Sequence, residues 1–130
     1  MASRLFIYGT LLLADNEFAE YLRQYSTVIG PGKLNGYLYD VGSYPAAIAT
    51  KESELTIHGS IVEIDSDEVL TTLDPYEGYG EGQPQPYLFI REIVDIETEN
   101  GLVKCWIYLY NHPTDDLKLI PSGDYIDYLK

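Results

Sequence analysis

The chain has 130 residues, 45% of them hydrophobic, and a formal net charge of −13. This length and composition are typical of a globular domain with a hydrophobic core, so we expect a single domain over residues 1–130. The excess of acidic residues argues against nucleic acid and anionic membrane surfaces as partners, because both are bound through Lys and Arg.

The first half of the chain is predicted to hold one helix among several strands. Residues 16–25 space their apolar side chains like one face of a helix, with Asp15 as its N-cap. Gly30-Pro31-Gly32 is interpreted as a break, and Gly59 as a bulge or a close backbone contact. Apolar or alternating runs predict strands at residues 4–8, 33–41, 46–50 and 56–64.

The second half is predicted to form a short helix, a loop and a hairpin. The helix spans residues 68–74 and is ended by Pro75, and three Gly and two Pro mark residues 78–86 as a loop. Asn100-Gly101 lies between two alternating runs, which is typical of a β-hairpin. These runs are residues 87–97 and 102–110. The whole pattern predicts an α+β fold, a small and mostly antiparallel β-barrel with short helices.

Metal and cofactor chemistry finds little support in the sequence. Cys105 is the only cysteine and lies in a predicted strand, so we expect a core residue rather than a nucleophile. His58 and His112 are the only histidines, and no Cys/His cluster accompanies them. The glycines of residues 78–82 precede a strand instead of opening a helix, unlike a dinucleotide-binding loop. We therefore expect neither metal nor cofactor, and, because no apolar run is long enough to span a membrane, a cytoplasmic location.

Four short motifs together carry more information than any one of them. They are YGTL at 8–11, LYDVGSYPAA at 38–47, LDPYEG at 73–78 followed by Tyr87 and Arg91, and PSGDYIDYL at 121–129. Their order and spacing, which cover nearly the whole chain, resemble the gamma-glutamylcyclotransferase-like family of small β-barrel proteins. That family includes gamma-glutamylamine cyclotransferases and plant avirulence-induced proteins. The nine-residue loop at 78–86 is longer than in small bacterial members.

The resemblance implies an intramolecular reaction that releases 5-oxoproline from a gamma-glutamyl amine or amide. The α-amine of the glutamyl group attacks its own γ-carbonyl, and the amine on the far side leaves. Nucleophile and electrophile already belong to one molecule, so no cofactor is required. One carboxyl group can serve as base and then as acid. The family match assigns this role to Glu77, whose pKa burial should raise toward neutrality.

The resemblance also implies a substrate site. With only eight Lys and Arg residues in the chain, backbone N–H groups are the expected partners of the substrate carboxylate and of the oxyanion. Gly9 allows the chain to leave its strand and removes a Cβ that would block a ligand, although an isolated glycine here also fits a β-bulge. Asp40 and Asp124 are expected to stabilise turns. The implied substrate-binding residues are Tyr8, Gly9, Thr10, Leu11, Tyr87 and Tyr125.

Two other classes of function are compatible with the sequence. The first is a non-catalytic protein that keeps the fold and binds a small carboxylic or amino-acid ligand. The second is a structural or interaction module, in which most of the 13 tyrosines would be exposed and no cavity would exist. The sequence leaves open the identity of the leaving amine and the oligomeric state. It also leaves open whether Arg91 pairs with an acidic neighbour or with a ligand.

Overall fold

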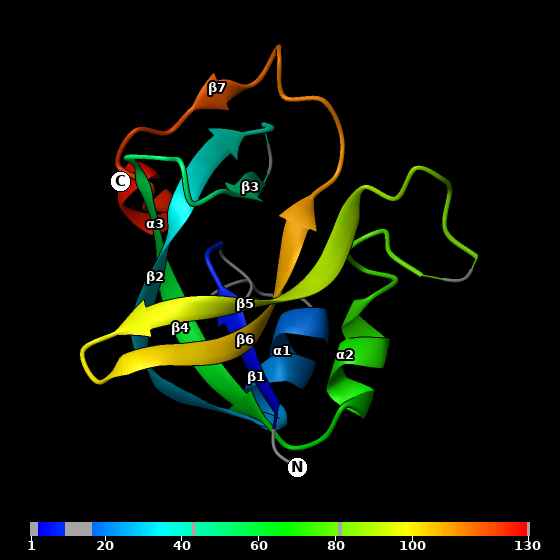
Figure 1. Ribbon diagram of the computed structural model, residues 1–130. Helices are drawn as coiled ribbons and strands as arrows, with labels where there is room; N and C mark the ends of the chain where they lie inside the picture. Colours follow the sequence, from blue (N-terminus) through cyan, green and yellow to red (C-terminus); the bar gives the residue numbers. More distant parts are fainter. Residues whose placement is uncertain (1–2, 10–16, 43, 81, 130) are drawn as a thin grey trace.

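The computed structural model describes residues 3–9, 17–42, 44–80 and 82–129 (Figure 1). Short helices interrupt the succession of strands near the beginning, in the middle and at the end of these ranges. The strands are β1 (Ser3–Ile7), β2 (Ser26–Asp40), β3 (Pro45–Ala49), β4 (Thr56–Ile64), β5 (Phe89–Thr98), β6 (Gly101–Tyr110) and β7 (Lys118–Leu119). The helices are α1 (Glu17–Gln24), α2 (Glu68–Leu73) and α3 (Tyr125–Tyr128).

Five of these strands close into a barrel in the order β2-β4-β1-β6-β5. The ring is closed where β5 meets β2, through the pair Lys33 and Glu97. Every neighbouring pair is antiparallel except β1 and β6, which run parallel at Leu5 and Trp106. Strands β3 and β7 extend the sheet along the second half of β2. The predicted mostly antiparallel barrel with short helices is confirmed.

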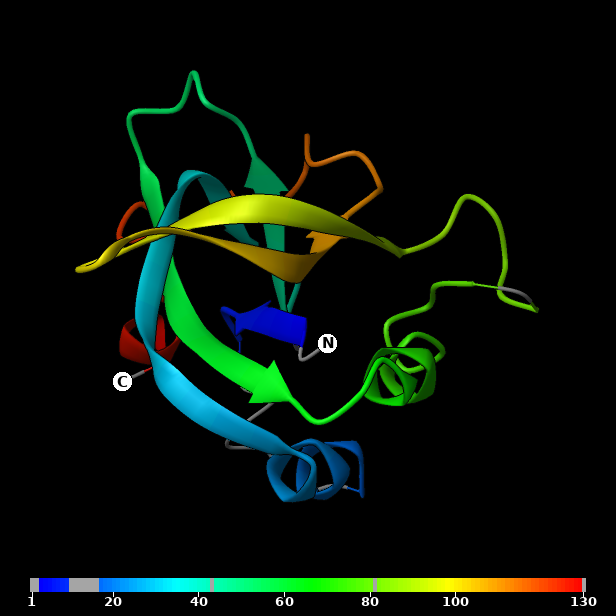
Figure 2. The same cartoon turned by 60° about the horizontal axis from the view of Figure 1, so that its bottom comes forward.

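The predicted break at Gly30-Pro31-Gly32 is wrong, because β2 runs through it without interruption. Between Val28 and Gly30 the pairing with β4 shifts by one residue, which is a β-bulge. Pro31 directly follows this bulge, where the ladder tolerates a missing N–H group. At Gly32 a Cβ would lie 2.5 Å from a core isoleucine. Glycine and proline therefore bend β2 around the barrel, as Figure 2 shows, rather than ending it.

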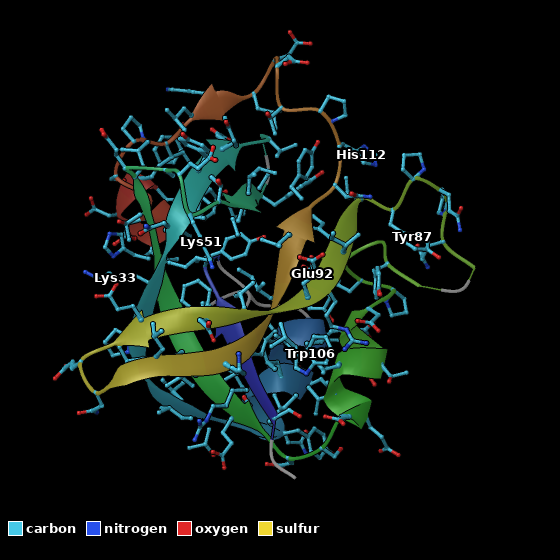
Figure 3. The ribbon with its side chains drawn as sticks, viewed as in Figure 1. Lys33, Lys51, Tyr87, Glu92, Trp106 and His112 are labelled. Carbon is cyan, nitrogen blue, oxygen red and sulfur yellow. The ribbon has the colours of Figure 1, made fainter. Side chains whose placement is uncertain are left out.

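The strands feed two hydrophobic clusters, one on each face of the sheet. The inner cluster fills the barrel with side chains from all five strands, among them Phe6, Ile61 and the predicted core residue Cys105. The outer cluster packs the barrel against α1 and α2, and the partly buried Trp106 extends it (Figure 3). Because Phe6 joins the first cluster and Leu5 and Ile7 the second, β1 is buried on both faces, as a central strand should be.

Three smaller predictions concern tight backbone packing and turns. At Gly59 a Cβ would lie 2.4 Å from the carbonyl oxygen of Ile7, so the close contact is confirmed. Asp40 Oδ1 accepts a hydrogen bond from the backbone N–H of Gly42 at 2.7 Å. Asp124 Oδ1 accepts one from the N–H of Asp127 at 3.0 Å and caps α3. Both aspartates thus stabilise turns, as predicted. None of the helices in the described ranges is long and apolar enough to cross a membrane.

Candidate active site

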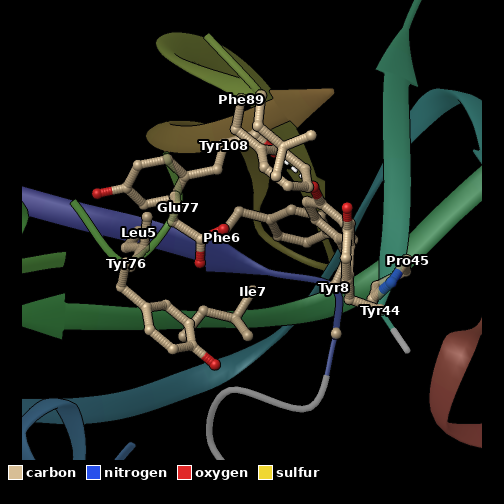
Figure 4. A pocket seen from close by; sticks show the side chains of 12 residues that line it. Leu5, Phe6, Ile7, Tyr8, Tyr44, Pro45, Tyr76, Glu77, Phe89 and Tyr108 are labelled. Atoms are coloured by element: carbon tan, nitrogen blue, oxygen red, sulfur yellow. Dashed lines mark hydrogen bonds between the residues drawn. The ribbon is translucent and has the colours of Figure 1, made fainter. Parts of the chain in front are cut away.

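A pocket of about 320 Å³ opens beside the end of β1 (Figure 4). Its wall is built mainly from apolar and tyrosine side chains, and Glu77 is the one charged side chain among the described residues that line it. The lining residues are Leu5, Phe6, Ile7, Tyr8, Gly9, Tyr44, Pro45, Tyr76, Glu77, Leu88, Phe89 and Tyr108. Within the described ranges, no group of three or more His, Cys, Asp or Glu side chains is placed to hold a metal ion.

Local structure at the end of α2 places Glu77 in this wall. The helix ends at Leu73, and Asp74 is its C-cap. The backbone N–H of Glu77 then donates to the carbonyl oxygens of Leu73 and Asp74, both at 3.1 Å, which extends the helical turn past Pro75. Gly78 follows with φ of 71°, a value that favours glycine, and redirects the chain toward the loop. The order helix, proline, glutamate and glycine therefore presents the Glu77 side chain to the pocket.

The Glu77 carboxyl group has an unusual proton affinity. The residue as a whole keeps partial exposure to solvent, but its carboxyl group faces the pocket (Figure 4). Burial and, to a smaller extent, the negative charge of Asp74 raise the pKa of Glu77 from 4.5 to about 7. A carboxyl group with this pKa can both accept and donate a proton near neutral pH. The predicted upward shift is present in the structure.

Behind Glu77, Arg91 of β5 forms a bidentate ion pair with Asp74. Arg91 Nε and Nη2 donate to Asp74 Oδ1 and Oδ2 at 2.8 and 2.9 Å. The guanidinium lies 4.6 Å from the ring centroid of Trp106 and 5.8 Å from that of Tyr79. The Tyr108 hydroxyl donates to Asp74 Oδ1 at 2.7 Å. The sequence left open whether Arg91 pairs with an acidic neighbour or with a ligand. In the structure it pairs with the acidic neighbour Asp74.

Two of the predicted substrate residues, Tyr8 and Gly9, line the pocket. The Tyr8 hydroxyl donates a hydrogen bond to the carbonyl oxygen of Tyr108. Burial, and then the charge of Glu77, raise the pKa of Tyr8 well above its usual value, so this phenol stays protonated. Gly9 lies beyond the last paired residue of β1, so the alternative of a β-bulge does not apply. Thr10 and Leu11 lie outside the described residues.

The structure does not bring Tyr87 and Tyr125 to this pocket, since neither is among the described residues that line it. Tyr87 stands at the end of the long loop (Figure 3) and packs its ring edge-on against Tyr79, with centroids 5.2 Å apart. Tyr125 is only 4% exposed, in the inner cluster, and stacks on Tyr128 of the same helix. These placements give Tyr87 a role in the base of the loop and Tyr125 a role in the core.

Several residues of the pocket wall, and Asp74 behind it, were not singled out from the sequence. Tyr44 and Pro45 lie within the LYDVGSYPAA motif, and Asp74 within LDPYEG, so their motifs were the available signal. Phe89 and Tyr108 lie in β5 and β6, where strand alternation indicates burial but no particular pocket. Pairing of Phe89 with Tyr110 across the hairpin brings these strand ends beside the end of β1.

We expect Gly9→Val to weaken ligand binding more than it weakens folding. A Cβ at Gly9 would lie 3.0 Å from Pro45 Cγ, at the pocket wall, and the larger valine side chain would occupy pocket space. Gly9 does not have a positive φ, so the substitution adds no backbone strain of that kind. Urea unfolding should therefore change less than the calorimetric affinity for 5-oxoproline, the ligand that the resemblance implies. A large loss of stability with normal affinity would instead show that Gly9 serves folding.

Comparison with known proteins places this fold and pocket in a family. The chain belongs to the family described as "Gamma-glutamyl cyclotransferase, AIG2-like", whose model matches residues 5–127. It is 32% identical over 125 residues to the gamma-glutamylcyclotransferase family protein YtfP of Escherichia coli strain K12, across 95% of this chain and 96% of that protein. The resemblance inferred from the four motifs is confirmed.

Solved structures agree with this assignment. The solution structure of YtfP from Escherichia coli superposes with a TM-score of 0.70 at 29% identity, over 98% of this chain and 99% of that one. The crystal structure of YkqA from Bacillus subtilis gives a TM-score of 0.72 at 26% identity. That match covers 100% of this chain but 44% of YkqA, so the present chain corresponds to less than half of that protein.

Proposed function

We propose that the protein is a gamma-glutamylcyclotransferase-type enzyme that releases 5-oxoproline and a free amine from a gamma-glutamyl amine or amide. The observation that carries this proposal is Glu77, a carboxyl group with a pKa of about 7 in a largely apolar pocket. Pure binding of an acidic ligand gains nothing from a buried carboxyl group. A carboxyl group whose pKa lies near 7 is, by contrast, well suited to proton transfer near neutral pH.

The reaction needs two protons to move from the attacking nitrogen to the departing one. Ionised Glu77 takes a proton from the substrate α-ammonium group, and the free amine attacks the γ-carbonyl carbon to form the ring C–N bond. Glu77 then gives this proton to the far nitrogen as the original C–N bond breaks. The ring nitrogen carries two hydrogens after the attack, and it passes one of them through ionised Glu77 to the released amine. The products are 5-oxoproline and an ammonium ion, so charge and atoms balance. Holding the glutamyl group in a folded conformation supplies up to roughly 7–11 kcal/mol of the barrier by proximity.

The other charges of the reaction require hydrogen-bond donors. The oxyanion of the tetrahedral intermediate and the α-carboxylate are proposed to bind backbone N–H groups of the YGTL segment, of which Tyr8 and Gly9 line the pocket. The Tyr8 hydroxyl is already used by the Tyr108 carbonyl oxygen. The proposed role of Tyr8 is therefore to shape the wall and exclude water rather than to donate to the substrate.

The charge of the pocket leads to a prediction about the leaving amine. No Lys, Arg or His is among the described residues that line it, and residues 10–16, 43 and 81 contain none in their sequence. A carboxylate on the leaving half would face Glu77 without a basic partner among these residues. We expect the 5-aminopentylamide of glutamate to exceed the equally long amide of 5-aminopentanoate by about tenfold in kcat/KM, roughly 1.4 kcal/mol of charge interaction. Equal values for the pair would contradict this charge preference.

The proposed function is tested by incubating the protein with a panel of gamma-glutamyl amines, amino acids and peptides. Release of 5-oxoproline, followed by mass spectrometry, is the expected result for at least one compound. Heat-treated protein serves as the control for spontaneous cyclisation. If no compound of the panel is converted while 5-oxoproline still binds in calorimetry, the chain is a non-catalytic binding protein on this fold.

A further inference from the structure

The Asp74 carboxylate is held more firmly than a surface ion pair would be. Arg91 donates two hydrogen bonds to it and Tyr108 donates a third, at 2.7 to 2.9 Å. The side chains of Arg91 and Asp74 are only 18% and 14% exposed. By contrast, the pair of Lys104 and Asp95 on the same hairpin is 78% and 51% exposed. A fixed and partly desolvated charge acts on its neighbours more strongly than an exposed one.

Two connections join Asp74 to Glu77. The backbone N–H of Glu77 donates to the Asp74 carbonyl oxygen at 3.1 Å, so both residues belong to the same turn after α2. Tyr108 donates to the Asp74 carboxylate and also lines the pocket with Glu77. The ion pair thus forms the support behind the wall that carries Glu77.

Building on the proposed function, we propose that Asp74, clamped by Arg91 and Tyr108, is a positioning residue whose fixed negative charge adds to the effect of burial and disfavours ionisation of Glu77. Asp74 does not line the pocket among the described residues, so it acts through Glu77 rather than on the substrate. Its charge opposes ionisation of Glu77, while Arg91 limits this effect by neutralising part of that charge.

The other ionisable groups around Glu77 do not compete with this role. Tyr8 at the end of β1, Tyr44 before β3 and Tyr108 of β6 have pKa values raised above 10 by burial, so they are neutral at pH 7. Tyr76 and Tyr79 flank Glu77 in the chain. Among the described residues, Asp74 is thus the charged group that acts on Glu77, and Arg91 is its ion-pair partner.

Substitution of the two partners should move the pKa of Glu77 in opposite directions. Asp74→Asn removes a negative charge and leaves Arg91 unpaired, and both changes favour ionised Glu77, so its pKa should fall. Arg91→Gln leaves the Asp74 charge uncompensated, so the pKa of Glu77 should rise. Mere loosening of the structure would instead admit water in both variants and lower this pKa in both.

The experiment measures the pKa of Glu77 in two ways on the folded full-length protein. The pH profile of kcat/KM for a gamma-glutamyl amide gives one value. A carbon-13 NMR titration of the side-chain carboxyl, assigned with Glu77→Gln, gives a second value that needs no activity. We expect a fall of about one unit for Asp74→Asn and a rise for Arg91→Gln. Asp95→Asn is the matched control, because it breaks the exposed pair with Lys104, and it should shift nothing.

A variant that fails to fold is replaced by the double variant Asp74→Asn, Arg91→Gln, which leaves no unpaired buried charge and should still lower the pKa of Glu77. Shifts of the same sign in both single variants, or no shift, would overturn the role of Asp74. Wild-type protein that forms no 5-oxoproline contradicts the proposed function instead. The NMR titration separates these two failures because it does not depend on turnover.

Discussion

Glu77→Gln should lower turnover of a gamma-glutamyl amide by about 10²–10⁴, the usual contribution of general acid–base catalysis. The amide is nearly isosteric with the carboxyl group and can still form hydrogen bonds, so the fold and the pocket should persist. It cannot carry a proton between the attacking and departing nitrogens. Affinity for 5-oxoproline should stay the same or improve, because a buried negative charge that repels an acidic ligand is removed.

The pH dependence gives this prediction a second readout. The wild-type rate should rise with pH through about 7 as Glu77 ionises, and the variant should lose that limb. Stability should respond with the opposite sign. Because the folded pKa of Glu77 is raised from 4.5 to about 7, folded protein binds more protons than unfolded protein in that range, and its stability falls as pH rises through it. Urea unfolding should therefore find the variant matched near pH 4 and more stable than wild type at pH 8.

The matched control for this experiment is Glu92→Gln. Glu92 is an exposed glutamate of β5 that does not line the pocket (Figure 3), so the change removes the same charge from the chain without touching the site. Its rate, pH profile and stability should follow the wild type. Full activity in the Glu77→Gln protein would exclude Glu77 from the mechanism and remove the enzymatic proposal.

Local features of this fold were predictable from the sequence, whereas features that depend on distant partners were not. Strand β4 was predicted with the bounds that it has, because its alternation and flanking turns are local. The burial of Glu77 depends on Phe89 and Tyr108, strand residues that reach the pocket only after the barrel closes. Its motif marked Glu77 as important, but sequence spacing did not reveal that Asp74 and Arg91 lie behind it.

The uninterrupted course of β2 and the burial of Tyr125 are two further features that local sequence did not predict. Glycine and proline usually end strands, but the bulge in β2 uses them for curvature, and this outcome depends on pairing with β4. Tyr125 lies in a motif that the resemblance connects with the substrate, yet α3 packs it into the barrel core. Whether a tyrosine of this chain faces a pocket or a core is decided by tertiary packing, which short motifs do not encode.

Replacing Tyr125 and Tyr76 one at a time should distinguish a tyrosine that stabilises the core from one that lines the pocket. Tyr125→Ala removes a side chain that is only 4% exposed, and it should lower the free energy of unfolding by about 3–5 kcal/mol, as for other large aromatic residues in cores. Among molecules that remain folded, KM and affinity for 5-oxoproline should be unchanged, because the pocket is lined by other residues. Urea unfolding measures the first effect, and assays well below the unfolding transition measure the second.

Tyr76→Ala is the complementary variant and should give the reverse result. Tyr76 is 44% exposed and lines the pocket, so its loss should cost little stability, within about 0.5 kcal/mol, but should raise KM by removing part of the wall around the substrate. Taken together, the Tyr125 variant should change mainly the free energy of unfolding, and the Tyr76 variant should change mainly KM. If Tyr125→Ala instead raised KM without loss of stability, Tyr125 would belong to the substrate site, as the family motif implied, and the pocket beside Glu77 would extend toward α3.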